Sequence, residues 1–403
     1  MKAAILLPTR FDVALLYKAK ELIRLLPQAL SLSGGVDEIA VGLPLVDEAI
    51  WRKCEAYLLA DSECKTVVRR LRWEHVVSEN VRRMFMIHQL PTDLSGIETV
   101  CVPRDWGWNF ADCDIWINFA DPAEGAILPL KPTAHYVSAL AERVVPAAFA
   151  PGIHDIFWHR QLDAFRMWRR AGVLLCSDET TATDLVGFAG VRKDKIIQVP
   201  SLARGETTLS SPPFSRDIDN VVWLVEPDAR HAPADFIEGL SLYWQEGGSI
   251  APVLASQNSA AFAEDAPTAC LSRLSVIERK LLSDLPTYQY ADLATLSRLL
   301  ARSGTLWSSE IAGGEGFALT MAQRHGMHFV GQRFPLHAEL GASNINDVTL
   351  YNAVDPSVIA DTLHTIEERG FVAPQKWRPA ETDFDRLQSY GFVIDRLQEW
   401  VNA

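Results

Sequence analysis

The segment Gly304-Thr-Leu-Trp-Ser-Ser-Glu-Ile-Ala-Gly-Gly-Glu-Gly-Phe-Ala-Leu-Thr320 joins a short apolar run to a glycine-rich turn and the start of a helical pattern. The run at 304–308 predicts a buried strand, and the pattern over 318–325 predicts a helix directly after the turn. The first N–H groups of a helix have no intrahelical acceptor, and the helix dipole favours negative charge there. This strand–turn–helix unit therefore predicts an anion site, suited to a diphosphate, in an α/β domain.

Glu315 stands inside this turn, among Gly313, Gly314 and Gly316. Glycines allow the backbone to approach a ligand closely. A carboxylate beside an anion site is unfavourable unless a neutral, hydroxyl-rich group needs an acceptor, and a sugar ring is such a group. A plain strand-to-helix turn with a capping acid explains the same residues, so this pattern alone leaves both interpretations open.

Apolar strands alternate with helical patterns on both sides of this segment. The predicted strands are 3–7, 39–43, 114–119, 136–137, 173–176 and 195–200, and then 221–225, 252–255, 304–308 and 328–331. The predicted helices are 15–26, 157–168, 180–188, 234–244, 292–301, 318–325, 355–368 and 383–401. Short continuous apolar strands that alternate with helices are typical of parallel sheets covered on both faces.

A linker separates the two series of elements. Residues 204–218 combine small residues with a proline pair, which is typical of a domain boundary. We therefore predict a domain over 1–203, a linker over 204–218, a second domain over 219–380 and a C-terminal helix over 381–403. The fold class is α/β, with two Rossmann-like domains facing each other across a cleft. Ligands of such sheets bind at the carboxyl ends of the strands, so we expect the site in that cleft.

Composition limits the partners. The 403 residues are 48% hydrophobic and 22% charged, with a formal net charge of −13 and a pI near 5.3. An acidic surface repels phosphate backbones, so we expect no nucleic-acid partner. The run Arg69-Arg70-Leu71-Arg72 is interpreted as a solvated helix face rather than a membrane site.

The expected compartment is the cytoplasm. There is no secretory leader pattern, and no apolar run reaches the roughly 18 residues that a membrane span needs. The six cysteines show no paired spacing, which predicts free thiols in a reducing compartment and no metal site.

The glycine-rich segment resembles the sugar-nucleotide motif of the retaining family 4 glycosyltransferases, roughly Ser-x-x-Glu-Gly-Phe-Gly-Leu-Thr/Pro-x-x-Glu-Ala. The stretch Glu315-Gly316-Phe317-Ala318-Leu319-Thr320 matches the opening of that motif. The resemblance implies the GT-B arrangement of two Rossmann-like domains, with Glu315 contacting the transferred sugar. It also implies that backbone amides at 318–320 hold phosphate. The donor-binding residues implied are Gly314, Gly316, Phe317, Ala318, Leu319, Thr320, Gln323 and Tyr290.

Gln323 departs from the family, because it stands where a second acid grips the donor ribose. Its carbonyl oxygen can still accept a hydrogen bond from a hydroxyl, although a carboxylate accepts more strongly. Tyr290 belongs to the segment Tyr288-x-Tyr290-Ala-Asp292, which resembles the family's base-binding loop and helix. An ordinary helix start explains that segment nearly as well.

The segment from Val221 to His231 resembles the first strand of the family's donor domain, which ends in an Arg-Lys pair facing the diphosphate. This implies catalytic roles for Arg230 and His231, beside Glu315, in stabilising the leaving nucleotide. A guanidinium keeps its charge at any pH, whereas a histidine must be protonated, which an adjacent diphosphate favours. A surface Arg-His pair in a loop is the alternative.

The first half of the chain gives weaker signals for the acceptor. Arg10 follows the first strand, Asp121 follows the strand at 114–119, and His135 precedes Tyr136; these three are the acceptor-side candidates. The turn Trp106-Gly-Trp108-Asn109 offers aromatic faces of the kind that stack on sugar rings, although core packing accounts for at least one of them. Where many family members carry a His-Asp pair, this chain has Ser138-Ala139.

We therefore predict a hexosyltransferase that moves a sugar from a nucleotide-diphosphate sugar to a hydroxyl of a glycan or lipid-linked glycan, with retention, in polysaccharide biosynthesis. The resemblance implies no metal and no cofactor beyond the nucleotide-sugar co-substrate. It leaves room for peripheral membrane or partner-enzyme association. Two alternatives stay open. One is a nucleotide-sugar epimerase on the same fold, which needs acid and base carboxylates in the first domain. The other is a catalytically weak partner subunit, which Gln323, His231 and Ser138 favour.

Overall fold

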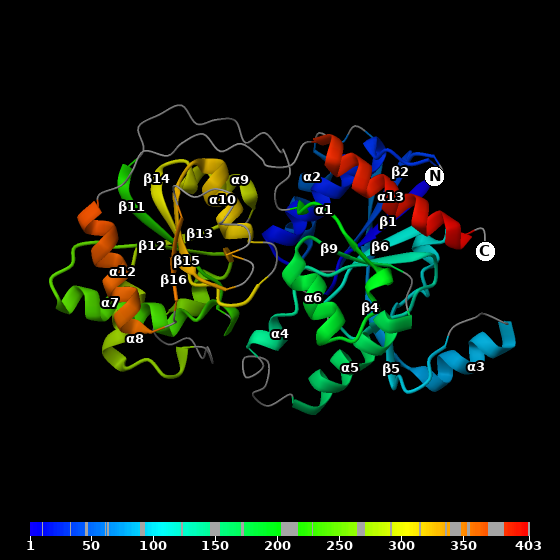
Figure 1. Cartoon of the computed structure of the whole chain (residues 1–403), viewed down its shortest axis with the longest axis horizontal. Helices are drawn as coiled ribbons and strands as arrows, with labels where there is room; N and C mark the ends of the chain where they lie inside the picture. The colour runs from blue at the N-terminus through cyan, green and yellow to red at the C-terminus, as the bar shows by residue number, and fades with distance from the viewer. Residues whose placement is uncertain are drawn as a thin grey trace. The chain divides into compact units, whose positions relative to one another are not determined.

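The computed structural model describes all of the chain except residues 10, 33, 45–46, 61, 63, 89–92, 122–123, 146–153, 171–172, 203–216, 228, 264–270, 291, 314–315, 335–336, 339–347, 353–354, 370–382 and 402–403. The chain forms two compact units (Figure 1). Unit 1 comprises Met1–Arg143, Phe149–Gly205 and Glu381–Ala403, and unit 2 comprises Val144–Ala148 and Glu206–Ala380. The predicted linker at 204–218 falls largely outside the described residues.

Unit 1 is built on a seven-stranded parallel sheet of order β10-β9-β8-β6-β1-β2-β3. Its strands are β1 (Lys2–Leu6), β2 (Glu38–Pro44), β3 (Lys65–Leu71), β6 (Ile115–Phe119), β8 (Thr133–Tyr136), β9 (Val173–Cys176) and β10 (Ile196–Gln198). From β1, the sheet continues through β2 to β3 on one side and through β6, β8 and β9 to β10 on the other. The strand order therefore reverses between β1 and β6, as in Rossmann-like sheets.

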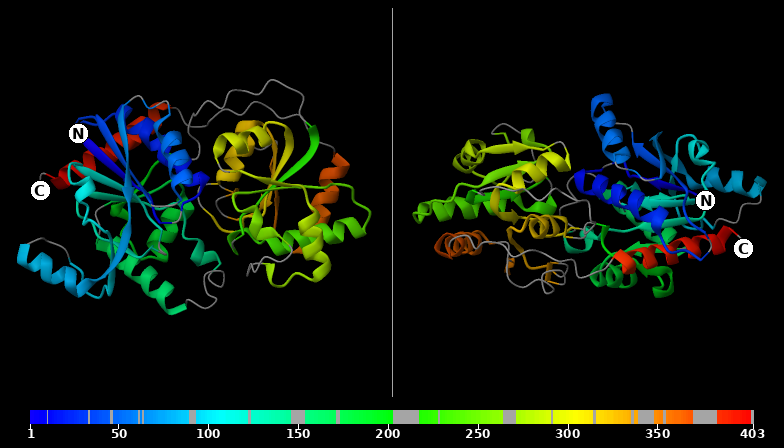
Figure 2. Two further views of the ribbon diagram at one scale, coloured as in Figure 1. Left: turned by 180° about the vertical axis from the view of Figure 1, so that it is seen from behind. Right: turned by 90° about the horizontal axis from the view of Figure 1, so that it is seen from above.

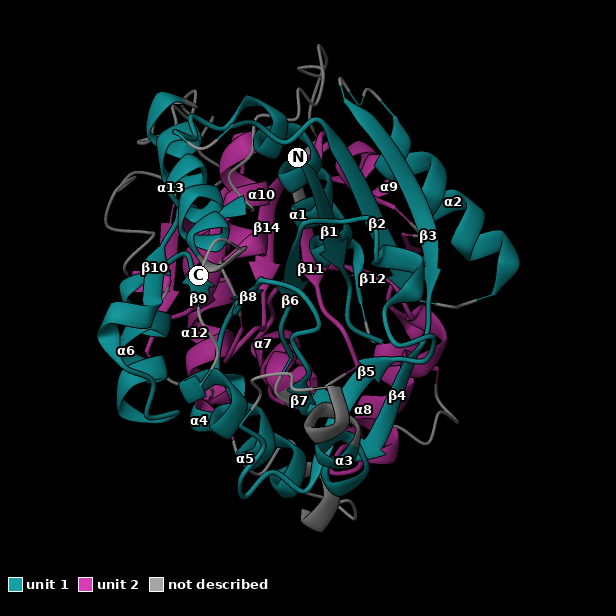
Figure 3. Ribbon diagram, turned by 90° about the vertical axis from the view of Figure 1, so that its right-hand side faces the viewer, with its two compact units in different colours: residues 1–143, 149–205, 381–403 teal, residues 144–148, 206–380 magenta. Residues whose placement is uncertain are grey.

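Helices cover both faces of this sheet (Figure 3). One face packs against α1 (Val13–Leu25), α2 (Glu48–Leu59) and α13 (Asp383–Val401), and the other against α5 (His154–Arg170) and α6 (Glu179–Gly187). The short helices α3 (Ser78–His88) and α4 (Ala141–Val144) also belong to unit 1. A three-stranded sheet of β4 (Trp73–Val77), β5 (Thr99–Pro103) and β7 (Ala126–Ile127) completes it.

The C-terminal helix α13 belongs to unit 1 rather than forming a part of its own. Tyr390 and Ile394 are fully buried in the core beneath α1. Asp395 accepts a 2.6 Å hydrogen bond from Ser31 Oγ. Both chain ends consequently lie on unit 1, where Gln398 Nε2 is 3.3 Å from Met1 Sδ (Figure 2).

Unit 2 is built on a six-stranded parallel sheet of order β13-β12-β11-β14-β15-β16. Its strands are β11 (Asp217–Leu224), β12 (Val253–Ser256), β13 (Thr287–Gln289), β14 (Ser303–Ser308), β15 (His328–Gln332) and β16 (Val348–Tyr351). One face carries α7 (Pro233–Gln245), α8 (Val276–Asp284) and α12 (Pro356–Arg369), and the other carries α9 (Leu293–Leu300) and α10 (Phe317–His325). The strand order reverses between β11 and β14.

The predicted elements of unit 2 are confirmed to within a few residues, and so are β1, β2, β6, β8, β9 and α13 of unit 1. The interpretation of Arg69-Arg70-Leu71-Arg72 as a helix face is wrong, because Arg69–Leu71 end the edge strand β3. An edge strand has a neighbour on one side only, so it tolerates the charged side chains that suggested a solvated helix. Among the described residues, no helix combines the length and apolar character needed to cross a membrane.

Candidate functional site

The reversal of strand order in unit 2 brings two predicted loops together. The loop after β11 contains Arg230 and His231 in a short 3₁₀ turn, and the loop after β14 is the glycine-rich turn. The Ile311 N–H donates a 2.7 Å hydrogen bond to the Arg230 carbonyl oxygen, which ties one loop to the other. Below them, Trp223 Nε1 donates to Ser309 Oγ at 3.1 Å. Open parallel sheets bind ligands at such a reversal point, beyond the carboxyl ends of the strands.

Among the residues that the structure describes, none provides a side-chain cap for the two helices that start from these loops. The residue before α10 is Gly316 (φ 57°, ψ 45°), and the residue before α7 is Ala232 (φ 38°, ψ 50°). By contrast, α1, α2, α6, α8 and α9 each begin at a side chain that accepts from the first turn, namely Asp12, Asp47, Asp178, Ser275 and Asp292. Uncapped first-turn amides, together with the positive end of the helix dipole, suit an anionic ligand.

Backbone strain accompanies this arrangement. Ala232 has a positive φ of 38°, which is rare for a residue with a Cβ. A side chain at Gly313 would overlap the carboxylate of Glu310. Strained or crowded backbone of this kind is found preferentially at functional sites. The predicted residues Gly314 and Glu315 lie outside the described residues, so the role of Glu315 stays a prediction.

The predicted phosphate-binding amides at the start of α10 need one correction. Ala318 and Leu319 lie in the first turn, where helical N–H groups have no acceptor within the helix. The Thr320 N–H, however, donates a 2.9 Å hydrogen bond to the Gly316 carbonyl oxygen and is therefore occupied. The side chains of Ala318, Leu319 and Thr320 are buried, while Phe317 is partly exposed. A ligand at this helix start would meet backbone rather than side chains.

Gln323 projects from the same helix, two turns after its start. Its side-chain nitrogen is buried and has no hydrogen-bond partner among the described residues. A buried amide donor without a partner carries a desolvation cost of about 1–3 kcal/mol. The predicted ribose contact runs through the Gln323 carbonyl oxygen and not this nitrogen, so it stays a prediction.

Glu226 organises the neighbouring strand ends, although the sequence patterns did not point to it. Its carboxylate accepts hydrogen bonds from Ser256 Oγ (3.0 Å), the Gln257 N–H (2.9 Å) and Tyr290 Oη (2.8 Å). These contacts connect the carboxyl ends of β11, β12 and β13. The hydroxyl of Tyr290 is occupied by Glu226 and its ring is buried, so the predicted base contact would have to come from the surrounding backbone. An acid followed by proline directly after a buried strand was the only sequence signal for Glu226.

The corresponding reversal point of unit 1 is closed by Glu124. Its two carboxylate oxygens accept from the Thr9 N–H (2.9 Å) and Thr9 Oγ1 (3.0 Å), which joins the loops after β1 and β6. Asp121 lies in the second of these loops and is partly exposed. The predicted acceptor-side residue Arg10 lies outside the described residues.

His135, the third acceptor-side candidate, is fully buried in β8 opposite Asn118 of β6. Burial lowers the pKa of His135 to about 4, so the ring is neutral at physiological pH. Neither ring nitrogen has a hydrogen-bond partner in the described part of the chain. In this conformation the ring is out of reach of an acceptor, which removes the basis for that assignment.

One group of side chains has metal-ligating atoms close together. Atoms of His75, Cys101 and Glu124 lie within 4.8 Å of one another. Both oxygens of Glu124 are already used by Thr9, and burial raises the pKa of the Cys101 thiol well above its usual range. A metal here would have to displace those bonds and deprotonate the thiol, so the group is best understood as packing.

Comparison with known proteins bears on the fold. No protein-family model matches the chain, and no curated protein matches it in sequence. Among solved structures, the UDP-GlcNAc 2-epimerase of Neisseria meningitidis bound to UDP-GlcNAc has a TM-score of 0.56 at 11% identity, covering 99% of this chain and 100% of that chain. HepE of Anabaena in complex with UDP and glucose has a TM-score of 0.55 at 12% identity, covering 100% and 98%. The UDP-GlcNAc 2-epimerase of Methanocaldococcus jannaschii in complex with UDP-GlcNAc and UDP has a TM-score of 0.52 at 12% identity, covering 99% and 100%.

Identities this low establish the fold alone. The predicted fold class is confirmed: the chain consists of two parallel-sheet α/β units, like its structural neighbours of the GT-B fold.

Proposed function

We propose that unit 2 binds a nucleotide-diphosphate sugar and that the protein transfers the sugar to a hydroxyl acceptor. The observation that carries the proposal is the pair of uncapped helix starts, α7 and α10, whose preceding loops are joined by the Ile311–Arg230 hydrogen bond at the reversal of strand order. The dipoles of both helices and the first-turn amides of Ala318 and Leu319 in α10 favour an anionic ligand, whereas α7 begins with Pro233, which has no N–H. A diphosphate is such a ligand.

The proposed reaction depends on stabilising a leaving diphosphate. The bond between the anomeric carbon and the diphosphate oxygen breaks, the acceptor oxygen bonds to that carbon, and the acceptor proton is released. The amides of Ala318 and Leu319 and the guanidinium of Arg230 would hold the charge that develops on the diphosphate, which is the main catalytic demand. His231 would add a donor when protonated, and Glu315 would orient the sugar.

The nucleoside would bind over the strand ends that Glu226 organises. Gln323, with its buried and unpartnered amide, would contact the ribose. The reaction needs no metal in this scheme, because the helix starts and Arg230 supply the positive charge. The acceptor would be a glycan or a lipid-linked glycan. The reaction would take place in the cytoplasm, with the protein either at the membrane surface or associated with a partner enzyme.

A second candidate is epimerisation of the nucleotide sugar. The neighbours bound to UDP-GlcNAc include two UDP-GlcNAc 2-epimerases, and unit 1 carries Asp121 and Glu124 after β6. Proton removal and return at a sugar carbon needs two such groups. Each oxygen of Glu124 accepts one hydrogen bond from Thr9, so Glu124 would have to give up or share these bonds to act as a base. The structural neighbours support epimerisation about as well as transfer.

Incubation with UDP-, GDP-, ADP- and dTDP-sugars, with and without glycan acceptors, tests the proposal. Transfer predicts free nucleotide diphosphate that forms faster with an acceptor and is unaffected by EDTA. Epimerisation instead predicts a changed sugar, detected by chromatography, without any acceptor. Thermal stabilisation by nucleotides without either product would identify a binding subunit, and the absence of all three effects would rule out the nucleotide-sugar site itself.

A further inference from the structure

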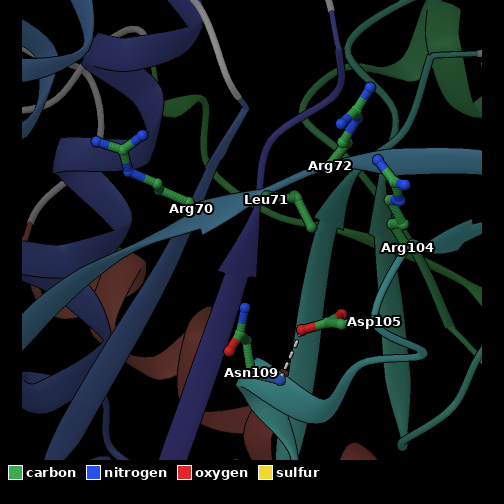
Figure 4. A pocket seen from close by; sticks show the side chains of 6 residues that line it. All are labelled: Arg70, Leu71, Arg72, Arg104, Asp105 and Asn109. Carbon is green, nitrogen blue, oxygen red and sulfur yellow. Dashed lines mark hydrogen bonds between the residues drawn. The ribbon is translucent and has the colours of Figure 1, made fainter. Parts of the chain in front are cut away.

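The edge of unit 1 carries a second polar site, separate from the loops of unit 2 described above. A cavity of about 380 Å³ lies where β3 and β5 end, and it is lined by Arg70, Leu71, Arg72, Arg104, Asp105 and Asn109 (Figure 4). This volume is at the lower end of the range for small-molecule pockets. In a chain with a net charge of −13, a pocket with three arginines is unusual.

Arg72 and Arg104 lie directly opposite each other. The antiparallel register of β4 and β5 pairs Trp73 with Pro103, and the Arg104 N–H donates a 2.7 Å hydrogen bond to the Arg72 carbonyl oxygen. Figure 4 shows the two side chains side by side, with Arg70 on the other side of Leu71. Like charges directly opposite each other destabilise a strand pair. Both arginines are exposed, and neither forms an ion pair with a carboxylate among the described residues.

The neighbouring arginines are neutralised, which makes this pair distinctive. Arg69 makes two hydrogen bonds to Asp112, of 2.7 and 2.9 Å. Arg70 bonds Glu48 at 2.7 Å and lies 5.0 Å from the Trp51 ring. Of the four arginines discussed here, Arg69 and Arg70 have carboxylate partners, whereas Arg72 and Arg104 have none among the described residues.

The carboxylate within the pocket, that of Asp105, forms no ion pair with either arginine in the described structure. Asp105 accepts from the Gly107 N–H (3.1 Å) and the Asn109 N–H (2.9 Å), which uses both of its oxygens to shape the following turn. That turn is closed by the Trp108 N–H donating to the Asp105 carbonyl oxygen at 3.1 Å. Its two central residues, Trp106 and Gly107, have φ values of 54° and 75°. Such turns favour Asn, Asp or Gly at the first central position, so Trp106 is held there at a cost.

The same turn presents aromatic surface to solvent. Trp108 is 81% exposed and Trp106 is 41% exposed. A solvent-exposed tryptophan offers a ring face on which a sugar can stack and an N–H that can donate a hydrogen bond. This edge thus combines two guanidinium groups that form no ion pair among the described residues with an exposed ring at Trp108, next in sequence to the lining residue Asn109.

We propose that this pocket binds the phosphate of a phosphorylated sugar and that the sugar ring stacks against Trp108. A phosphate dianion between Arg72 and Arg104 would remove their repulsion and accept several charge-assisted hydrogen bonds from two planar donors. The pocket lies within unit 1, and its ligand is proposed independently of the transfer reaction above. The binding itself depends on unit 1 alone.

Titration calorimetry on the full chain tests this proposal. The ligands are glucose 1-phosphate, galactose 1-phosphate and N-acetylglucosamine 1-phosphate, with inorganic phosphate and glucose for comparison. At least one hexose phosphate should bind several-fold more tightly than inorganic phosphate, and glucose should not bind measurably. Arg72→Gln and Arg104→Gln should each weaken that binding about tenfold, because each removes a charge-assisted contact. Trp108→Ala should reduce the hexose phosphate to the affinity of inorganic phosphate.

Arg192→Gln is the matched control, because Arg192 is an exposed arginine of unit 1 that is paired with Asp194 at 2.6 Å. It should leave binding unchanged. The proposal is overturned if no hexose phosphate exceeds inorganic phosphate, or if both pocket variants bind like the wild type. Binding confined to phosphatidylglycerol vesicles, without binding of soluble sugar phosphates, would overturn it in favour of a membrane contact.

A parallel titration with UDP separates this proposal from that for unit 2. Arg72→Gln and Arg104→Gln should retain wild-type affinity for UDP. A chain that binds hexose phosphates but no nucleotide would refute the donor site and leave the arginine pocket standing. The reverse result would refute the pocket alone.

Discussion

The environment of His135 leads to a pH dependence of stability that can be measured. The ring is fully buried between Asn118 of β6 and Leu174 of β9, and burial lowers its pKa to about 4. In the unfolded chain a histidine titrates near pH 6.5. Between these values the unfolded state binds a proton that the folded state does not. The contribution of the neutral, buried His135 to the free energy of unfolding is therefore fully present above about pH 6.5. This contribution is lost as the pH falls towards 4.

The magnitude follows from the two pKa values. Between about pH 7.5 and about pH 5, the proton taken up by the unfolded state lowers the free energy of unfolding by about 2 kcal/mol. His135→Leu removes the titrating group and fills the site with an apolar side chain. The variant should therefore lose about 2 kcal/mol less than the wild type over the same pH interval. The variant also removes two buried ring nitrogens that have no hydrogen-bond partner among the described residues. At about pH 5 its free energy of unfolding should therefore be at least as large as that of the wild type.

Denaturant unfolding at the two pH values, followed by circular dichroism, measures this difference. His337 of unit 2 provides a second test, because it is also fully buried and its pKa is also lowered to about 4, although its Nδ1 is 2.8 Å from the Gln332 carbonyl oxygen. His337→Leu should show the same relief in the unfolding of unit 2. NMR titration gives the direct test: a His135 ring that titrates near 6.5, with unchanged pH dependence in His135→Leu, would refute burial and restore His135 as an acceptor-side candidate.

Three further substitutions test other parts of the structure. Arg230→Gln removes the guanidinium proposed to face the diphosphate and should weaken UDP binding about tenfold or more in calorimetry; unchanged affinity would exclude the contact. Glu226→Gln weakens the bonds from three donors, including Tyr290, and should destabilise unit 2 by about 1–3 kcal/mol in denaturant unfolding; a stability equal to wild type would show that this network is unimportant. Gly107→Ala places a Cβ at φ 75° and 2.8 Å from the Trp116 ring, so unit 1 should lose about 2–4 kcal/mol, and an unaffected melting temperature would contradict the turn geometry.

The fold was predictable where strands are buried and helices are capped locally. Asp178 and Asp292 cap α6 and α9 close to the predicted helix starts at 180 and 292, and the predicted range 383–401 for the last helix agrees with α13. These features depend on neighbouring residues only. The segment from 45 to 110 was less predictable, because β3 is an edge strand whose arginines mask the alternation expected of a strand.

The candidate site was predictable only in its local parts. The glycine-rich turn and the Arg230 loop each carry a sequence pattern, but the hydrogen bond from Ile311 to Arg230 depends on the order of β11 and β14 in the sheet. Glu226 was missed for the same reason, since its partner Tyr290 is 64 residues away. The pairing of Arg72 with Arg104 likewise needs the register of two strands that no local pattern specifies.

A crystal structure of the chain with UDP is the most direct test of the donor site. The account predicts diphosphate oxygens within about 3 Å of the Ala318 and Leu319 amide nitrogens, with the Arg230 guanidinium on the same phosphates. Two results would contradict the account. One is UDP bound elsewhere on the chain, and the other is bound UDP with the helix starts of α7 and α10 covered by side chains.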